Sequence, residues 1–438
     1  MTFALDRRRF LSATSIAFGG LVASGCNAAV PGGTPSADPY GPLLPDPGGL
    51  LDLPKGFSYR VISRLGDTMT DGGRVPDAAD GMGCFALPGG KLALVRNHEL
   101  RPGKDSGGAT GATFDRMPDG SPMPGGTTNI VLDAKTLKVE RQFRSLSGTI
   151  RNCAGGVTPW GTWLTCEEDV TRAGPKAQQD HGWAFEVPAN ATGPVTPVPL
   201  KAMGRFNREA AVVDPVSGMV FQTEDRSDGL LYRFIPAVPG QLAQGGKLQA
   251  LALAEGEPAS GPAPGGWAKV RWIDLDDPES PNDDLRQRGA AAGAMVFSRG
   301  EGIEMGLGKD GVSELFFVCT SGGKAKLGQV FRLRLDPKGD WLQLFFESTD
   351  PAQFNYGDNL TVSPGGHLIV CEDQYTDDAE NHLRGLTPAG LPYDFARVRL
   401  KTEPAGACFS PDGKVLFVNL YSPTTTLAIT GPWQHLKA

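Results

Sequence analysis

One short pattern recurs along this chain: a turn containing Gly or Pro, followed at once by a run of apolar, strand-forming residues. It occurs six times, at residues 87–95, 158–164, 214–221, 309–317, 363–370 and 410–417. Short strands repeated in this way are typical of propellers, in which each repeat builds one blade. The 59 Gly and 36 Pro residues exclude long helical bundles and coiled coils, which do not tolerate breakers at that density. The sequence therefore predicts an all-β fold, a six-bladed β-propeller with irregular insertions.

A two-domain β-sandwich is the alternative, but it gives no reason for one turn pattern to recur. The uneven spacing of the repeats predicts blades of unequal size. We expect a single propeller domain over residues 50–438, preceded by a linker over residues 27–49 that is rich in Pro and Gly.

The first 26 residues resemble an export signal. Three arginines and Phe10-Leu11 precede a weakly apolar stretch, as in twin-arginine (Tat) leaders, and this stretch is too short to span a membrane stably. Ala23-Ser24-Gly25-Cys26 is similar to a lipoprotein cleavage box. We therefore expect export by the Tat translocase to the periplasm, or to the outer membrane with a tether through lipidated Cys26.

The formal net charge of -7 argues against a nucleic-acid partner, because nucleic-acid binders normally present a basic face. The placement of the acids is more informative than their number. In the second, third and fifth repeats the residue six places before the turn Pro is Cys153, Glu209 or Asp358, and Glu301 occupies the equivalent region of the fourth. In the first and sixth repeats Met82 and Ala405 stand there, with Asp80 and Glu403 two residues earlier. If the first strand of each blade lines the channel, these residues form a ring.

The second strand of several repeats also ends in acidic residues. Four repeats carry them at this place, namely Glu99, Glu167-Glu168, Glu224-Asp225 and Glu372-Asp373. The fourth repeat has Thr320-Ser321-Gly322-Gly323 instead. Carboxylates crowded around one channel repel one another unless they are protonated or bridged by cations. The pattern therefore predicts a cation site.

The ligand types narrow the choice of cation. With 5 His in the chain, a His-rich zinc site is disfavoured. Oxygen-rich sites suit Ca²⁺, Mg²⁺, Mn²⁺ or ferric iron, and a thiolate at Cys153 points toward a transition metal. The remaining alternative for Cys153 is a small residue in a tight Gly turn.

The string from Arg151 to Glu168, Arg-Asn-Cys-Ala-Gly-Gly-Val-Thr-Pro-Trp-Gly-Thr-Trp-Leu-Thr-Cys-Glu-Glu, resembles the signature of the PhoX-type alkaline phosphatases. The likeness covers most of the mature chain in order. It continues through residues 97–99, 181–183, 209–212, 223–226, 301–302, 320–323, 358–360 and 371–373.

The resemblance implies a Tat-exported propeller phosphatase with a mixed iron and calcium centre. We expect two Fe³⁺ and several Ca²⁺ ions, and a monomer that acts on small phosphoesters. The resemblance assigns Cys153 to iron and further metal contacts to Glu167, Glu168, Glu209, Glu301, Glu372 and Asp373, with looser correspondences at Glu99, Glu224, Asp225 and Asp358. Two departures stand out: the chain is compact for the family, and Arg208 stands where many relatives have His.

The expected activity is hydrolysis of phosphate monoesters, in which cations neutralise the phosphoryl oxygens and no side-chain nucleophile is needed. Arg151, Arg226 and Arg299 adjoin the metal motifs and are the candidate catalytic arginines, since guanidinium groups suit phosphate. A surface or strand-pairing role is the alternative for each. A phosphotriesterase or phosphodiesterase on the same scaffold is one rival function, and a non-catalytic calcium-binding propeller of the cell envelope is another.

Overall fold

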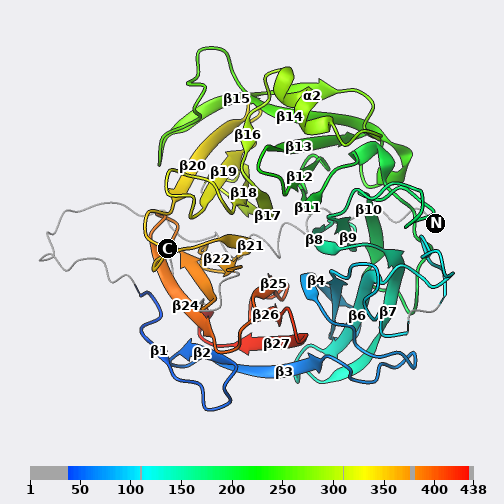
Figure 1. The fold of residues 1–438 in the computed structure, drawn as a ribbon. Coiled ribbons are helices and arrows are strands. Elements are labelled where there is room, and N and C mark those ends of the chain that lie inside the picture. The colour runs from blue at the N-terminus through cyan, green and yellow to red at the C-terminus, as the bar shows by residue number, and fades with distance from the viewer. Residues whose placement is uncertain (1–37, 109–110, 309, 375–379, 434–438) are drawn as a thin grey trace, which may run out of the picture.

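The computed structural model describes residues 38–108, 111–308, 310–374 and 380–433. The expected leader, including Cys26, lies outside these residues. Antiparallel sheets radiate from a central space, as Figure 1 shows, and the protein is an all-β propeller. Among the described residues, no helix combines the length and apolar character needed to cross a membrane.

Innermost strands from along the whole chain surround the central space. Each lies beside the next, and the last returns to the first. They are β4 (Ala79–Leu87), β8 (Asn152–Val157), β11 (Arg208–Val213), β17 (Gly300–Leu307), β21 (Gly357–Val362) and β25 (Pro404–Phe409).

Each inner strand pairs in antiparallel fashion with the strand that follows it. These second strands are β5 (Lys91–His98), β9 (Thr162–Glu167), β12 (Val220–Glu224), β18 (Ser313–Cys319), β22 (Leu368–Glu372) and β26 (Val415–Leu420). The recurrent turns of the sequence are the connections between these two sets of strands. The repeated pattern therefore marks the same place in successive sheets.

The outer strands complete the sheets and differ in number from one sheet to the next. They are β6 (Gly125–Asp133), β7 (Val139–Thr149), β10 (Ala184–Pro188), β13 (Gly229–Pro236), β14 (Gly246–Leu253), β15 (Trp267–Leu275), β19 (Gln329–Arg334), β20 (Trp341–Glu347), β23 (His382–Leu386), β24 (Pro392–Val398), β2 (Leu51–Pro54), β1 (Leu43–Leu44), β27 (Thr425–Thr430) and β3 (Ser58–Arg64). The short strand β16 (Val296–Phe297) pairs with β13, and the helical segments are η1 (Lys201–Met203), η2 (Leu242–Gln244) and α2 (Leu285–Ala291).

The sheets do not separate into six independent units as the sequence predicts. Strand β15 pairs with β20, with Trp267 opposite Gln343 and Lys269 opposite Trp341, and this joins β11–β15 and β17–β20 into one continuous sheet. The physical reason is that the outer edge of β15 is free to accept a partner, and β20 supplies one. The other sheets each contain one inner strand.

The two ends of the described chain meet in one sheet. Strand β3, near the start, pairs with β27, near the end, with Ser58 opposite Thr430 and Arg64 opposite Thr425. A sheet assembled from both ends of the chain closes the ring and leaves no open seam at that point.

Part of the expected linker, residues 27–49, belongs to the fold. Leu43 and Leu44 pair with strand β2, and the Tyr40 ring packs edge-on against Phe57 at 5.1 Å between centroids. Apolar side chains in this stretch are the reason, since Tyr40 and its neighbours have a hydrophobic cluster to cover.

Candidate metal centre

A β-bulge lies at the same place in each inner strand. The register shifts between Ala79 and Met82, Asn152 and Gly155, Arg208 and Ala211, Gly300 and Ile303, Gly357 and Leu360, and Ala405 and Cys408. A bulge adds one unpaired residue and re-aims the side chains beside it. The residues at the bulge of the first five strands are Asp80, Cys153, Glu209, Glu301 and Asp358, and β25 has Gly406-Ala407 there.

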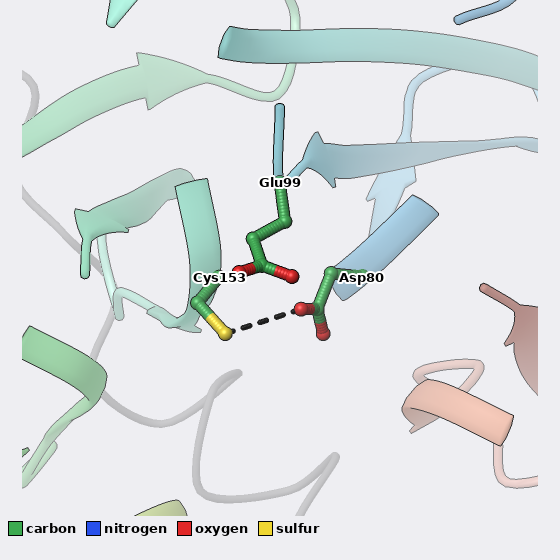
Figure 2. A group of neighbouring side chains, drawn as sticks. All are labelled: Asp80, Glu99 and Cys153. Atoms are coloured by element: carbon green, nitrogen blue, oxygen red, sulfur yellow. Dashed lines mark hydrogen bonds between the residues drawn. The ribbon is translucent and has the colours of Figure 1, made fainter. Parts of the chain in front are cut away.

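These bulge residues gather into overlapping groups. The ligand atoms of Asp80, Glu99 and Cys153 all lie within 4.8 Å of one another. Figure 2 shows the three side chains converging from β4, from the residue after β5 and from β8. The Cys153 thiol donates to Asp80 Oδ2 at 3.1 Å. Two further groups meet the same 4.8 Å limit, namely Cys153–Glu168–Glu209 and Glu209–Glu301–Asp358. Because neighbouring groups share Cys153 or Glu209, they form one continuous arc, which we call the acidic arc.

A second set of side chains comes from the residue that directly follows each second strand. These residues are Glu99, Glu168, Asp225, Thr320, Asp373 and Tyr421. Their backbone N–H groups make the same kind of bond, for example from Glu168 to the carbonyl of Arg151 at 2.9 Å and from Tyr421 to the carbonyl of Glu403 at 3.0 Å. The Tyr421 hydroxyl donates to Glu99 Oε2 at 2.5 Å, so the sixth repeat contributes a phenol where others contribute an acid.

The first acid of each Glu-Glu or Glu-Asp pair has partners of its own away from the arc. Glu167 accepts hydrogen bonds from the Gly182 N–H at 2.9 Å and from His181 Nδ1 at 2.6 Å. Glu224 accepts from the Tyr232 hydroxyl at 2.7 Å. Because successive residues of a strand point to opposite faces, only the second member of a pair faces the arc.

Glu372 follows the same rule. Its carboxylate accepts from the Asn355 N–H at 2.9 Å and from Arg384 Nε at 2.8 Å. The structure therefore does not bring Glu167, Glu224 or Glu372 into the three groups above, although the sequence predicts metal contacts for them. Glu167 and Glu372 each accept hydrogen bonds from three or more protein donors where they stand.

Burial and mutual repulsion dominate the electrostatics of the arc. Desolvation, and then the neighbouring acids, raise the pKa of Glu168 to about 8, and the same causes raise that of Asp358 to about 8. The pKa values of Asp80, Glu209 and Glu301 are also raised well above normal by desolvation and then by neighbouring carboxylates.

Buried oxygens without partners indicate what this arrangement can hold. Both carboxylate oxygens of Glu209 and Asp80 Oδ1 are buried and accept no hydrogen bond from the residues that the structure describes. Unpaired buried acceptors are costly, and cations satisfy them directly. The donor set of one thiol and several carboxylates fits hard cations together with a transition metal, so the residues present fit the expected iron and calcium.

Two of the three candidate arginines lie at the arc. Arg151 forms ion pairs with Glu99 at 2.6 Å and with Glu168, and Arg299 binds Asp225 through Nε at 2.8 Å and Glu301 at 2.9 Å. Both occupy the position two residues before a bulge ligand, and both have positive φ, 47° for Arg151 and 57° for Arg299. The arginines are thus fixed beside the acids by a locally unusual backbone.

Arg226 and Arg208 lie differently. Arg226 donates to Asn207 Oδ1 at 2.9 Å and its side chain is 38% exposed, so it lies at the margin of the centre. Arg208 is fully buried, and its Nε donates to Gln222 at 2.8 Å while Nη1 donates to the Gly182 carbonyl at 3.0 Å. Arg208, which stands where a His is expected, therefore links β11 to β12 and to Gly182 and does not enter the arc.

The structure adds three residues that the sequence-based ligand set omits. Asp80 belongs to the first group, and Tyr421 bonds to Glu99. Desolvation and then the neighbouring Asp373 raise the pKa of Glu403 well above normal, which places that carboxyl beside the arc. The signal for Asp80 and Glu403 was present, since both precede the expected ring position by two residues. Nothing in the sequence pattern singles out Tyr421.

The fold and the centre define a propeller whose channel carries clustered acids and one thiol, a class suited to binding metal ions. Comparison with known families places the protein further. The chain belongs to the family described as alkaline phosphatase PhoX, which it matches over residues 38–136 and 125–424. This family is metal-dependent and typically exported, and it consists of phosphatases. The family likeness seen in the sequence motifs is thereby confirmed.

The comparisons with curated sequences and with solved structures add distant similarities. A comparison with curated protein sequences finds no significant match. Among solved structures, the chain is similar to the gluconolactonase XC5397 of Xanthomonas campestris, with 14% identity over 90% of this chain and 98% of that chain and a TM-score of 0.41. It is also similar to the β-propeller domain of Cps50 (Swd1) from Myceliophteria thermophila, with 12% identity over 86% and 100% and a TM-score of 0.39. A protein of unknown function from Dyadobacter fermentans gives 11% identity over 86% and 100% and a TM-score of 0.45.

Proposed function

We propose that this protein is an exported phosphatase that hydrolyses phosphate monoesters at a centre of two Fe³⁺ and several Ca²⁺ ions in the propeller channel. The observation that carries the proposal is the acidic arc, in which Glu209 has two buried oxygens without a hydrogen-bond partner among the described residues. Bound cations would supply charge neutralisation of the phosphoryl group and an activated water.

The residues proposed to hold the cations are those that face the arc. They are Asp80, Glu99, Cys153, Glu168, Glu209, Asp225, Glu301, Asp358, Asp373 and Glu403. Glu167, Glu224 and Glu372 instead form hydrogen bonds that fix the ends of their strands. The acid that follows each of them in the sequence faces the arc. This division keeps one thiol and several carboxylates at the centre and explains why the acids come in pairs.

The arginine side chains near the arc have a supporting role in the proposed reaction. Arg151 and Arg299 each pair with two acids, so they hold the carboxylates in place and offset part of their repulsion. A substrate phosphate entering the arc would compete for the same guanidinium groups, which suit bidentate phosphate contacts. We propose that Arg226, which lies partly exposed at the margin, meets the substrate before it reaches the centre.

The wider assignment rests on sequence and family. We propose export by the Tat translocase, a membrane tether through lipidated Cys26, a monomeric state, and small phosphoesters as partners without nucleic acid. We also propose that the continuous sheet of β11–β15 and β17–β20 is two fused blades. The support is that each of its two inner strands carries the bulge found in every other sheet, which gives six blades in all.

Metal quantification beside a phosphoester panel across pH tests the function. We expect iron and calcium in the purified protein, with turnover of monoesters faster than of diesters or triesters. Faster triester turnover would favour a phosphotriesterase or phosphodiesterase on this scaffold. Calcium without a transition metal and without turnover would favour a non-catalytic envelope propeller.

Replacement of the thiol gives a sharper test. Cys153→Ser should lose iron and slow monoester turnover by roughly 10- to 100-fold, the range seen when groups that support a metal are altered. Cys408→Ser is the matched control, because Cys408 lies partly exposed in the last inner strand and outside the three groups. Full iron content and full turnover in Cys153→Ser would show that the centre does not use this thiol.

A further inference from the structure

A cavity of about 460 Å³ begins at one end of the acidic arc. Its inner wall includes Ala78, Glu99 and Tyr421, and Glu99 is itself a member of the first ligand group. The rest of its lining includes residues 74–77, which precede β4, and Ser422, which follows β26. A molecule bound at the arc could therefore extend into it.

The wall of the cavity is partly apolar. Val75 and Leu100 are buried and contribute to it, and Leu65, which is 44% exposed, stands on its outer side. Such a surface suits a short carbon skeleton, since burying apolar area stabilises a bound ligand.

Three cationic side chains, Arg74, Arg101 and Lys104, also line the cavity. Arg74 Nη1 donates to the Gly66 carbonyl, a neutral acceptor, at 3.0 Å. Among the described residues, no carboxylate forms an ion pair with any of the three. These charges are therefore open to an anion from outside the chain.

The acids of the same cavity are already engaged by the protein. Asp77 accepts from the Thr424 N–H at 2.9 Å and from the Ser422 hydroxyl at 2.8 Å. Asp105 accepts from the Gly107 N–H at 2.8 Å. Glu99 is bonded to Arg151 and to Tyr421. Asp77 and Asp105 have neutral donors and no ion pair among the described residues, so three cationic side chains face two such acids and the excess charge is positive by one.

We propose that this cavity is a subsite for a second anionic group of the substrate. The preferred substrates are then organic phosphates that carry two anionic groups separated by a short carbon chain, such as bisphosphates. One phosphate lies at the arc, the carbon chain lies along Val75 and Leu100, and the second anion meets Arg101 and Lys104. This inference rests on the proposed function and extends it to a substrate class.

The test compares two substrates that differ only in the second phosphate, propane-1,3-diol bisphosphate and propyl phosphate, on the metal-loaded full-length enzyme. The wild type should have the higher kcat/KM for the bisphosphate. The double variant Arg101→Glu/Lys104→Glu should lose that preference by roughly tenfold, because two exposed charges are each reversed. Its kcat/KM for propyl phosphate should stay within about twofold, since neither residue contacts the arc.

A matched variant controls for overall charge. Lys135→Glu/Lys338→Glu makes the same change in net charge at exposed positions outside the cavity, and it should keep the preference. The wild-type preference should also weaken as salt is raised, because exposed charges are screened. Equal kcat/KM for the two substrates in the wild type, or an equal loss in the control variant, would overturn the subsite.

A binding measurement separates this proposal from the proposed function. If the wild type turns over neither substrate, the function fails, and calorimetry then compares propane-1,3-bisphosphonate with propylphosphonate. Tighter binding of the bisphosphonate that Arg101→Glu/Lys104→Glu removes would uphold the subsite without any turnover. Equal binding of the two phosphonates would overturn it.

Discussion

At the scale of single residues, the acidic pairs show how adjacent identical side chains acquire different roles. Glu167 and Glu168 are neighbours in the sequence, yet Glu167 is bonded to His181 and backbone N–H groups, whereas Glu168 lies in a group with Cys153 and Glu209. The sequence can predict that such pairs are special. It cannot decide which member faces the centre, because that depends on where the strand leaves the sheet.

The two glutamates should respond differently to the same change. Glu168→Gln should keep the fold and lower metal content and monoester turnover, by roughly 10- to 100-fold in turnover. Glu167→Gln should lower the free energy of unfolding by about 3 kcal/mol, because it breaks a buried network with His181. Denaturant unfolding and metal analysis of both variants check this. Similar losses of stability in both would contradict the division of roles.

At the scale of elements, the sequence predicted the inner strand, turn and second strand that recur in each sheet. It did not predict the strand pairing that joins two of the sheets. The turn at Pro159-Trp160-Gly161 and its counterparts mark the link from inner to second strand, because Gly and Pro have specific backbone requirements. No sequence pattern indicates the β15–β20 pairing, because the pairing of two strand edges depends on the tertiary arrangement of the sheets. The sequence does not mark the bulges either. Asp80 lies two residues before the expected ring position because β4 is longer between its bulge and its turn than β8 and β11 are.

Close packing between inner strands makes a further prediction at this scale. A Cβ on Gly156 of β8 would stand 1.8 Å from the Ala211 carbonyl oxygen of β11, which is backbone and cannot turn aside. Gly156→Ala should therefore force these strands apart and cost about 2 kcal/mol or more of stability.

Gly193→Ala is the control, because a Cβ there meets no atom within 4 Å and the φ angle is not in the left-handed region. Denaturation midpoints for the two variants give the comparison. An unchanged midpoint in Gly156→Ala would show that the ring is looser than its inner strands indicate.

At the scale of the whole molecule, the acidic arc couples metal binding to the stability of the ring. Its carboxyls come from strands throughout the chain, and their crowding opposes closure whenever they are ionised without cations. The proposed metal ions would therefore stabilise the closed form, because the assembled arc exists only in the folded ring.

The pH dependence of the metal-free protein follows from these shifts. Glu168 has a pKa raised from 4.5 to about 8, so the folded state holds more protons than the unfolded state between those values. The free energy of unfolding of the metal-free protein should therefore fall as pH rises from about 5 to about 8. Addition of Fe³⁺ and Ca²⁺ should restore stability at the high end, where the carboxylates are ionised.

Thermal or denaturant unfolding at pH 5.5, 7 and 8.5, with and without a chelator, measures this. The metal-loaded protein is the control, and its stability should be greater at pH 7 than at pH 5.5, because protons compete with cations for the same oxygens. A metal-free protein that gains stability from pH 6 to pH 8 would contradict the interpretation.

The pairing of β3 with β27 has a consequence for the order in which the protein comes into being. Residues 58–64 are synthesised early, but they wait for residues 425–430 before their sheet is complete. Glu99 likewise waits for Tyr421, which lies 322 positions further along. During translation the early blades therefore form an incomplete ring, and we expect their acids to be exposed to water. We expect metal loading to follow release from the ribosome, since only the whole chain provides an enclosed place for the ions.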